Sequence, residues 1–296
     1  DAVPGILIVD DSPGTIDFLI GLLGEYDISV AVDGKGALEQ IAQEIPDLIL
    51  LDVNMPEMDG YEVCLIIKSN PNTKDIPVLF LSANTDADSV VKGFDAGGVD
   101  YIAKPYHPQE ILARIGTHIK LKQLRDKLEK MAYEDSMTGI SNRRRFFDKA
   151  GDLFAGRRSA DLPFCLFAID MDKFKNINDT YGHNVGDEVI KKFVSIVKKE
   201  LKEEDCFARF GGDEFILMMT RTNSEKAMDV LKRIQKNTSE THQLLGNSVN
   251  FSISAGLAEV KDFNENIDEV IRRADRNLYK EKQRKLNSSR DYYRSR

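Results

Sequence analysis

Short apolar runs alternate with longer amphipathic stretches through the first hundred residues. Five runs, at about 5–9, 28–32, 47–51, 77–81 and 99–102, have the character of parallel strands covered on both faces. Helical patterns lie between them, at about 13–24, 34–44, 59–70 and 86–96, and another begins at 107. Five strand–helix units predict a doubly wound α/β domain whose functional site lies at the carboxyl ends of the strands.

The pattern then changes to one long predicted helix, from 108 to about 134, interrupted only by Gly116. Apolar residues recur along it at spacings of 3, 4 and 3: Leu121, Leu124, Leu128 and Met131. This heptad seam is typical of a parallel two-stranded coiled coil. A single amphipathic helix packed on its own domain is the alternative that the pattern leaves open.

In the second half, two apolar runs at 206–210 and 215–219 flank the sequence Gly211-Gly212-Asp213-Glu214. Such runs around a glycine turn predict a β-hairpin. Its tip then carries two carboxylates, the hard oxygen ligands that Mg²⁺ prefers. An acidic, solvated turn is the other reading of the tetrapeptide alone.

Charge divides the chain into two parts. The net charge is −8 over 296 residues, but residues 1–105 hold 19 Asp and Glu against 5 Lys, a net of −14 that leaves +6 for the rest. Two domains are expected, and the basic one suits an anionic ligand such as a nucleotide. No basic run with interleaved aromatics predicts nucleic-acid binding, and no apolar run reaches membrane-spanning length. Three scattered cysteines favour reduced thiols, and hence a cytoplasmic protein.

Carboxylates follow two of the predicted N-terminal strands. Asp10 and Asp11 come after the first strand and Asp52 after the third, while Ser82 ends the fourth and Lys104 follows the fifth. Three carboxylates that meet at one sheet edge repel each other unless a cation lies among them. The sequence therefore predicts a divalent metal site there.

These positions, over residues 1–120, resemble the receiver domains of two-component response regulators. The resemblance implies that Asp52 accepts a phosphoryl group from a sensor histidine kinase. It also implies that Mg²⁺ is bound by Asp10, Asp11, Asp52 and the Asn54 carbonyl. Ser82 and Lys104 would bind the phosphoryl oxygens, and Tyr101 would be the aromatic residue that moves with Ser82.

The segment from Arg209 to Phe215 looks like the signature of the GGDEF family, the diguanylate cyclases. The opening motif at 135–144, the segment 164–175 and the residues from Asn178 to Asp187 resemble the family too. The resemblance implies a dimer that joins two GTP into cyclic di-GMP. We therefore expect a receiver at 1–120, a helical linker at 121–134 and a cyclase at 135–296. Two copies of the chain would dimerise through their receivers and linker helices. The cyclase fold would be α+β, nucleotidyl-cyclase-like, with a mostly antiparallel sheet.

Site residues carry over by the same resemblance. Asp170, Asp213 and the Met171 carbonyl would bind Mg²⁺, and Glu214 would either position the ribose 3′-hydroxyl or bind a second metal. Asn178 and Asp187 would read guanine, although Asp187 also suits an N-cap before a helix at 188–202. The phosphates would be bound by the amides of Asp172, Lys173 and Phe174, and by Lys175 and Lys282.

The chain departs from the family in two places. Leu286 stands where the family ending has an arginine, and Arg284 or Lys285 are the candidates to replace it. The product-binding motif Arg-x-x-Asp becomes Lys202-Glu203-Glu204-Asp205, which leaves a weak product site of Lys202, Asp205 and Arg209. The rival to an enzyme is a catalytically silent receptor for GTP or cyclic di-GMP. The presence of Asp170, Asp213 and Glu214 favours the enzyme.

Overall fold

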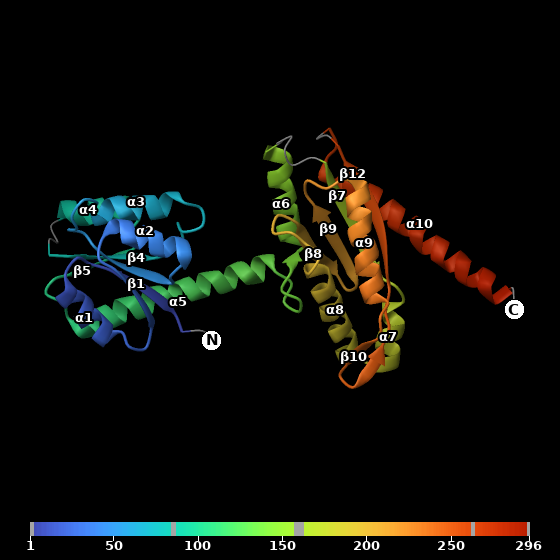
Figure 1. The fold of residues 1–296 in the computed structure, drawn as a ribbon, viewed down its shortest axis with the longest axis horizontal. Coiled ribbons are helices and arrows are strands. Elements are labelled where there is room, and N and C mark those ends of the chain that lie inside the picture. The colour runs from blue at the N-terminus through green and yellow to red at the C-terminus, as the bar shows by residue number, and fades with distance from the viewer. Residues whose placement is uncertain (1–2, 84–86, 157–162, 262–263, 295–296) are drawn as a thin grey trace. The chain divides into compact units, whose positions relative to one another are not determined.

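The computed structural model describes residues 3–83, 87–156, 163–261 and 264–294, with side chains described as far as residue 287. The chain divides into two compact units, residues 1–128 and 129–296 (Figure 1). Within the described ranges, no helix is long and apolar enough to cross a membrane.

The first unit is a five-stranded parallel sheet in the order β2-β1-β3-β4-β5. Its strands are β1 (Gly5–Val9), β2 (Asp27–Ala31), β3 (Leu48–Asp52), β4 (Val78–Ser82) and β5 (Asp100–Ala103). The helices are α1 (Pro13–Leu22), α2 (Gly34–Gln43), α3 (Gly60–Ser69), α4 (Ala87–Asp95) and α5 (Pro108–Tyr133). One face packs on α2 and α3 and the other on α1 and α5 (Figure 1). This confirms the doubly wound receiver fold. Residue 86, where the fourth helix was expected to begin, lies outside the described residues.

The long helix α5 changes character along its length. Its first half buries Ile111, Ile115 and Ile119 against the parallel sheet. The heptad seam that follows is exposed in the single chain, up to 65% at Leu128 and 70% at Met131. The seam is therefore not buried against its own chain, and the coiled coil stays a prediction.

The second unit is built on a sheet in the order β12-β7-β9-β8-β6. Every pair in it is antiparallel except β6 with β8, which confirms the mostly antiparallel sheet. The strands are β6 (Ser141–Asn142), β7 (Phe164–Met171), β8 (Cys206–Gly211), β9 (Glu214–Met219) and β12 (Ile253–Val260), beside a small hairpin of β10 (His242–Leu244) and β11 (Asn247–Val249). The helices are α6 (Arg143–Gly156), α7 (Phe174–Tyr181), α8 (His183–Lys198), α9 (Ser224–Thr238) and α10 (Ile267–Arg294).

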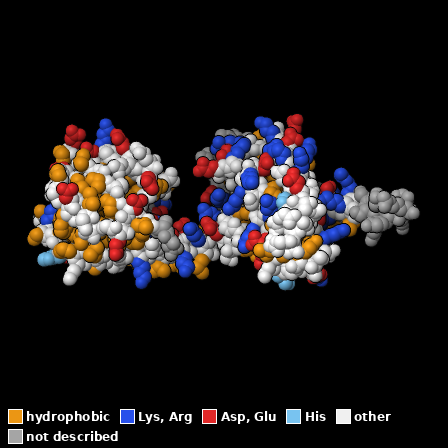
Figure 2. All heavy atoms as spheres, turned by 60° about the horizontal axis from the view of Figure 1, so that its bottom comes forward, with side chains coloured by type: hydrophobic (Ala, Val, Ile, Leu, Met, Phe, Trp, Pro, Cys, Tyr) orange, Lys and Arg blue, Asp and Glu red, His pale blue; other side chains and the backbone are white. Residues whose placement is uncertain are grey.

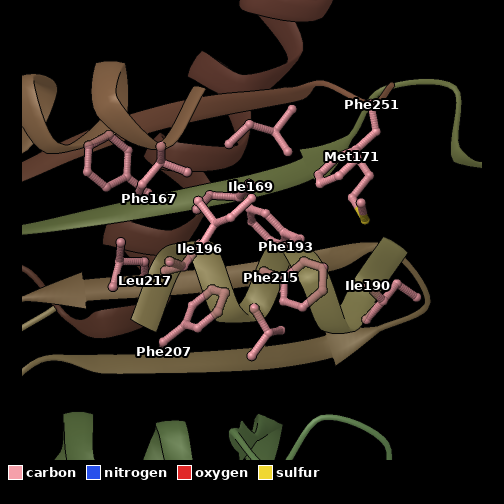
Figure 3. Packing of buried hydrophobic residues seen from close by; sticks show 14 of the residues in the cluster. Phe167, Ile169, Met171, Ile190, Phe193, Ile196, Phe207, Phe215, Leu217 and Phe251 are labelled. Carbon is pink, nitrogen blue, oxygen red and sulfur yellow. The ribbon is translucent and has the colours of Figure 1, made fainter. Parts of the chain in front are cut away.

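Side-chain alternation along the strands divides this sheet into two faces. Phe167, Phe207 and Phe215 point to the face covered by α8, where the rings of Phe207 and Phe215 pack against that of Phe193 (Figure 3). The opposite face packs on α6 and α10. Residues that neighbour Phe215 and Ile169 along their strands, namely Glu214 and Asp170, therefore belong to the α6 and α10 face.

The predicted helix at 188–202 was wrong in its bounds. Helix α8 begins at His183 and ends at Lys198. Gly182 adopts a φ of 85°, so the chain leaves α7 and enters α8 within one residue, as glycine permits. Asp187 consequently lies inside α8 and is not its N-cap.

Candidate functional site

Three carboxylates of the first unit meet at the carboxyl ends of β1 and β3. Oxygens of Asp10, Asp11 and Asp52 all lie within 4.8 Å of one another. Lys104 Nζ donates to Asp52 Oδ1 at 2.7 Å and to Asp10 Oδ2 at 3.3 Å. Burial raises the pKa of Asp52, and the ammonium of Lys104 opposes that shift. The donor set of hard oxygens suits a divalent cation, as the sequence predicted.

The predicted switch residues Ser82 and Tyr101 belong to the neighbouring strands β4 and β5. Ser82 is buried at the end of β4. The Tyr101 hydroxyl lies 2.6 Å from that of Tyr61 on α3, and Tyr61 donates to the Ser89 carbonyl on α4. Sequence reasoning missed Tyr61. The pattern of a helix does not show that the hydroxyl of one of its residues contacts Tyr101 on a strand 40 residues away.

Strand register brings the cyclase carboxylates together. Asp170, the penultimate residue of β7, pairs directly with Glu214, the first residue of β9. The Met171 amide donates to the Asp213 carbonyl at 3.3 Å. The hairpin and the strand end that the sequence placed far apart therefore form one site, at one end of the sheet.

A cation from α10 completes this end of the sheet. Lys282 Nζ lies 2.6 Å from Asp170 Oδ1. Burial raises the pKa of Asp170, Lys282 lowers it, and the nearby carboxylates of Asp213 and Asp172 raise it further. A divalent cation would relieve this repulsion and would neutralise phosphates that approach the same edge.

Asp172 has a supporting role that the sequence did not show. Its amide donates to the Ser252 carbonyl, and its carboxylate accepts from the hydroxyls of Ser252 and Ser254 at 2.7 and 2.6 Å and from Lys285 Nζ at 2.7 Å. Burial opposes the charged form, but these hydrogen bonds outweigh it and lower the pKa of Asp172. In this structure the amide of Asp172 is already bonded to Ser252, so among the predicted phosphate-binding amides those of Lys173 and Phe174 are the stronger candidates.

The backbone at the start of α7 suits the phosphate binding that the family resemblance implies. Lys173 adopts the left-handed conformation, with φ 53° and ψ 33°, directly before the helix. The first amides of a helix have no partner within the helix and favour anions. The amides around Phe174 thus remain for this role, and Lys175 lies exposed in the same turn.

The two predicted guanine-reading residues lie on neighbouring helices. Asn178 Oδ1 on α7 is buried and has no hydrogen-bond partner among the described residues. A Cβ at Gly186 on α8 would clash with that oxygen. The lack of a side chain at Gly186 therefore makes room for the Asn178 amide. Asp187, half-buried, follows Gly186 directly. The arrangement suits a ligand that supplies a donor to the buried amide oxygen.

Two of the predicted product-site side chains, those of Asp205 and Arg209, are bonded within the protein. Asp205 is buried, and its carboxylate accepts from the amides of Lys202 and Thr220. The guanidinium of Arg209 bonds the Gly212 carbonyl at 2.8 and 3.0 Å and Asp135 at 3.1 Å. Arg209 thereby joins the opening motif to the catalytic hairpin, a contact that sequence reasoning missed.

The two candidates to replace the absent arginine differ in their contacts. The side chain of Arg284 is 83% exposed and lies 3.9 Å from Glu281. Lys285 is directed to Asp172. Leu286 itself is half-exposed. Basic side chains nevertheless gather over the second unit on the face that Figure 2 shows, in keeping with the uneven charge of the chain.

Known families match both units. Residues 132–288 match the family described as "Diguanylate cyclase, GGDEF domain". The chain belongs to this family. Residues 6–116 match the response regulator receiver domain. This member of the family therefore has a receiver domain before its GGDEF domain, as the sequence indicated.

One relative aligns with nearly the whole chain, and another with about half of it. "Response regulator PleD" of Caulobacter vibrioides is 28% identical over 288 residues, which cover 94% of this chain and 63% of that protein. "Diguanylate cyclase DgcM" of Escherichia coli K12 is 34% identical and covers 54% of this chain and 38% of its own length. The chain thus spans less than two thirds of these relatives.

A solved structure matches the C-terminal part. It is the coiled coil and GGDEF domain of DgcB from Caulobacter crescentus in complex with c-di-GMP. It is 29% identical with a TM-score of 0.52, and it covers 58% of this chain and 94% of that chain. The likeness supports the fold described above for the second unit.

Proposed function

We propose that the chain is a diguanylate cyclase that condenses two GTP molecules into cyclic di-GMP and two pyrophosphates. The observation that carries the proposal is the pairing of Asp170 with Glu214 beside the ammonium of Lys282. In each condensation, a ribose 3′-oxygen forms a bond to the α-phosphorus of the other GTP. The bond from that phosphorus to pyrophosphate breaks, and the hydroxyl proton passes to a base.

The residues divide this work between binding and orientation. Asp170, Asp213 and the Met171 carbonyl would hold Mg²⁺, which supplies positive charge beside the triphosphate. Lys282, Lys175 and the first amides of α7 would bind the phosphates, and Asn178 and Asp187 would read guanine. Glu214 would position the 3′-hydroxyl or accept its proton. Catalysis would come mainly from orientation and electrostatics.

The same proposal includes control by phosphorylation. One cyclase domain holds one of the two GTP molecules, so two copies must face each other, joined through the receiver and the exposed seam of α5. A cytoplasmic histidine kinase would phosphorylate Asp52, with Mg²⁺ held by Asp10, Asp11, Asp52 and the Asn54 carbonyl. The hydrogen bonds from Tyr101 through Tyr61 to α4 support a route from that site to the receiver surface.

The first test is cyclic di-GMP formation from GTP and Mg²⁺, with and without beryllofluoride as a mimic of phosphorylated Asp52. We expect strong stimulation in the wild-type protein and none in Asp52→Asn, which removes the acceptor. Equal activity in both states would keep the enzyme and discard the switch. No product in either state, with GTP still bound, would favour the silent receptor and point to Leu286.

Product inhibition should be weak or absent. Lys202 keeps the charge of the family arginine but lacks its planar fork for guanine, and Asp205 and Arg209 are bonded internally. Initial rates with added cyclic di-GMP measure this, with Lys202→Arg as the matched variant in which inhibition should strengthen. Inhibition of the wild-type protein at low micromolar product would contradict the prediction.

A further inference from the structure

The C-terminal helix is held to the sheet along one side. Gly256 of β12 lies directly under the helix backbone, because a Cβ there would contact the Ala274 carbonyl and the Leu278 amide. Lys282 and Lys285 continue this side of α10 at spacings of 4 and 3 residues. Both lysines therefore face the end of the sheet that carries the catalytic carboxylates.

Lys285 connects three separate segments. Its ammonium donates to Asp172 Oδ2 and to the Ile253 carbonyl, each at 2.7 Å. Asp172 belongs to the loop between β7 and α7, and Ile253 begins β12. The hydroxyls of Ser252 and Ser254 bond the same carboxylate. One side chain of α10 thus fixes both the loop and the strand beside it.

The fixed loop carries the groups assigned to GTP. Asp170 lies two residues before Asp172, and the amides at the start of α7 follow it. Lys282, one turn before Lys285 on α10, contacts Asp170 at 2.6 Å. A change in how Lys285 holds Asp172 would therefore move Asp170 and Lys282 relative to each other.

Lys285 directly precedes Leu286, the position at which the family ending has an arginine. Residues three and four positions after Lys282 are neighbours on the same side of a helix. A positive charge can consequently stand at 285 in place of 286 without leaving the site. The ammonium of Lys285 donates to two protein oxygens, however, so its charge serves the structure of the site.

We propose that Lys285 is a positioning residue of the cyclase site, a role that rests on the proposed function. It joins α10 to the loop through Asp172, and it thereby sets the relative placement of Asp170 and Lys282 that triphosphate binding requires. It does not contact the substrate.

The test compares Lys285→Met and Lys285→Arg with Lys280→Met, a matched change at an exposed lysine of the same helix. Two measurements are made: cyclase kinetics, and amide hydrogen exchange of residues 171–178 and 278–287 without nucleotide. We expect K285M to lower kcat/KM by about 10- to 100-fold, the range for a misplaced catalytic group, and to speed exchange in both segments. K285R should retain most of both properties, and K280M should match the wild type.

Two results would overturn the proposal. One is K285M with wild-type kinetics and exchange. The other is a raised KM with unchanged exchange, which would assign Lys285 to direct phosphate contact. If K285M does not fold, Ser254→Ala carries the same test, because it removes one hydrogen bond to Asp172 and should shift both measurements in the same direction, more mildly. A wild-type protein that makes no cyclic di-GMP would end the proposed function, while the exchange measurement would still decide the role of Lys285.

Discussion

Asp170→Asn should lower cyclic di-GMP formation by at least about 10³-fold. The substitution removes the charge of a carboxylate that we propose as a metal ligand, and with it the counter-charge of Lys282, which lies 2.6 Å away. Loss of several kcal/mol of charge stabilisation in the transition state, about 4 kcal/mol here, corresponds to this factor. Initial rates with saturating GTP and Mg²⁺ measure it.

Asp170→Asn should still fold, so the lost activity can be assigned to the site itself. Asparagine has the shape of aspartate, and burial disfavours the charged form of Asp170. We therefore expect an unchanged or higher Tm, as at other sites where function opposes stability. Asp229→Asn on α9, where the exposed carboxylate pairs only weakly with Lys232, is the matched control and should keep wild-type activity. A D170N protein that retains a tenth of the wild-type kcat would show that Asp170 does not bind the essential metal.

The parts of the fold that the sequence predicted best are those with a local signal. The first strand was expected at 5–9 and is Gly5–Val9, because a continuous buried run has one plausible structure. The hairpin at Gly211–Glu214 was equally predictable from its glycines. Candidate residues that lie at the ends of such strands, Asp52 and Asp170 among them, could therefore be named in advance.

The interactions that could not be predicted join residues far apart in the sequence. Lys285 and Asp172 are separated by 113 residues, and Tyr61 and Tyr101 by 40. Neither pair leaves a periodic pattern, because the contact depends on how helices lie on the sheet. The contacts of Asp172 could not be predicted for the same reason: its serine partners belong to the segment around β12, and no local pattern connects that segment with the end of β7.

Gly186→Ala should raise the KM for GTP about 10- to 100-fold. The added methyl group would contact Asn178 Oδ1, the buried oxygen that lacks a partner among the described residues. Displacing it would cost the hydrogen bond offered to guanine, about 1–3 kcal/mol for a buried polar group left unpaired. Alanine is also the better helix former by about 1 kcal/mol. A loss of affinity in a protein that still folds would thus arise at the pocket and not in α8.

Direct binding of 3′-deoxy-GTP, which lacks the attacking hydroxyl, measures this affinity without turnover. Gly151→Ala in α6 is the matched control, because nothing lies within 4 Å of the added methyl group there. That variant should bind the nucleotide as the wild type does and should be slightly more stable. If G186A binds 3′-deoxy-GTP as tightly as G151A does, the base is recognised elsewhere, and the assignment of Asn178 to guanine is lost. Tight binding by G151A together with weak binding by G186A would place the guanine between α7 and α8, where the added methyl group meets the side chain of Asn178 first and the ring of Phe174 next.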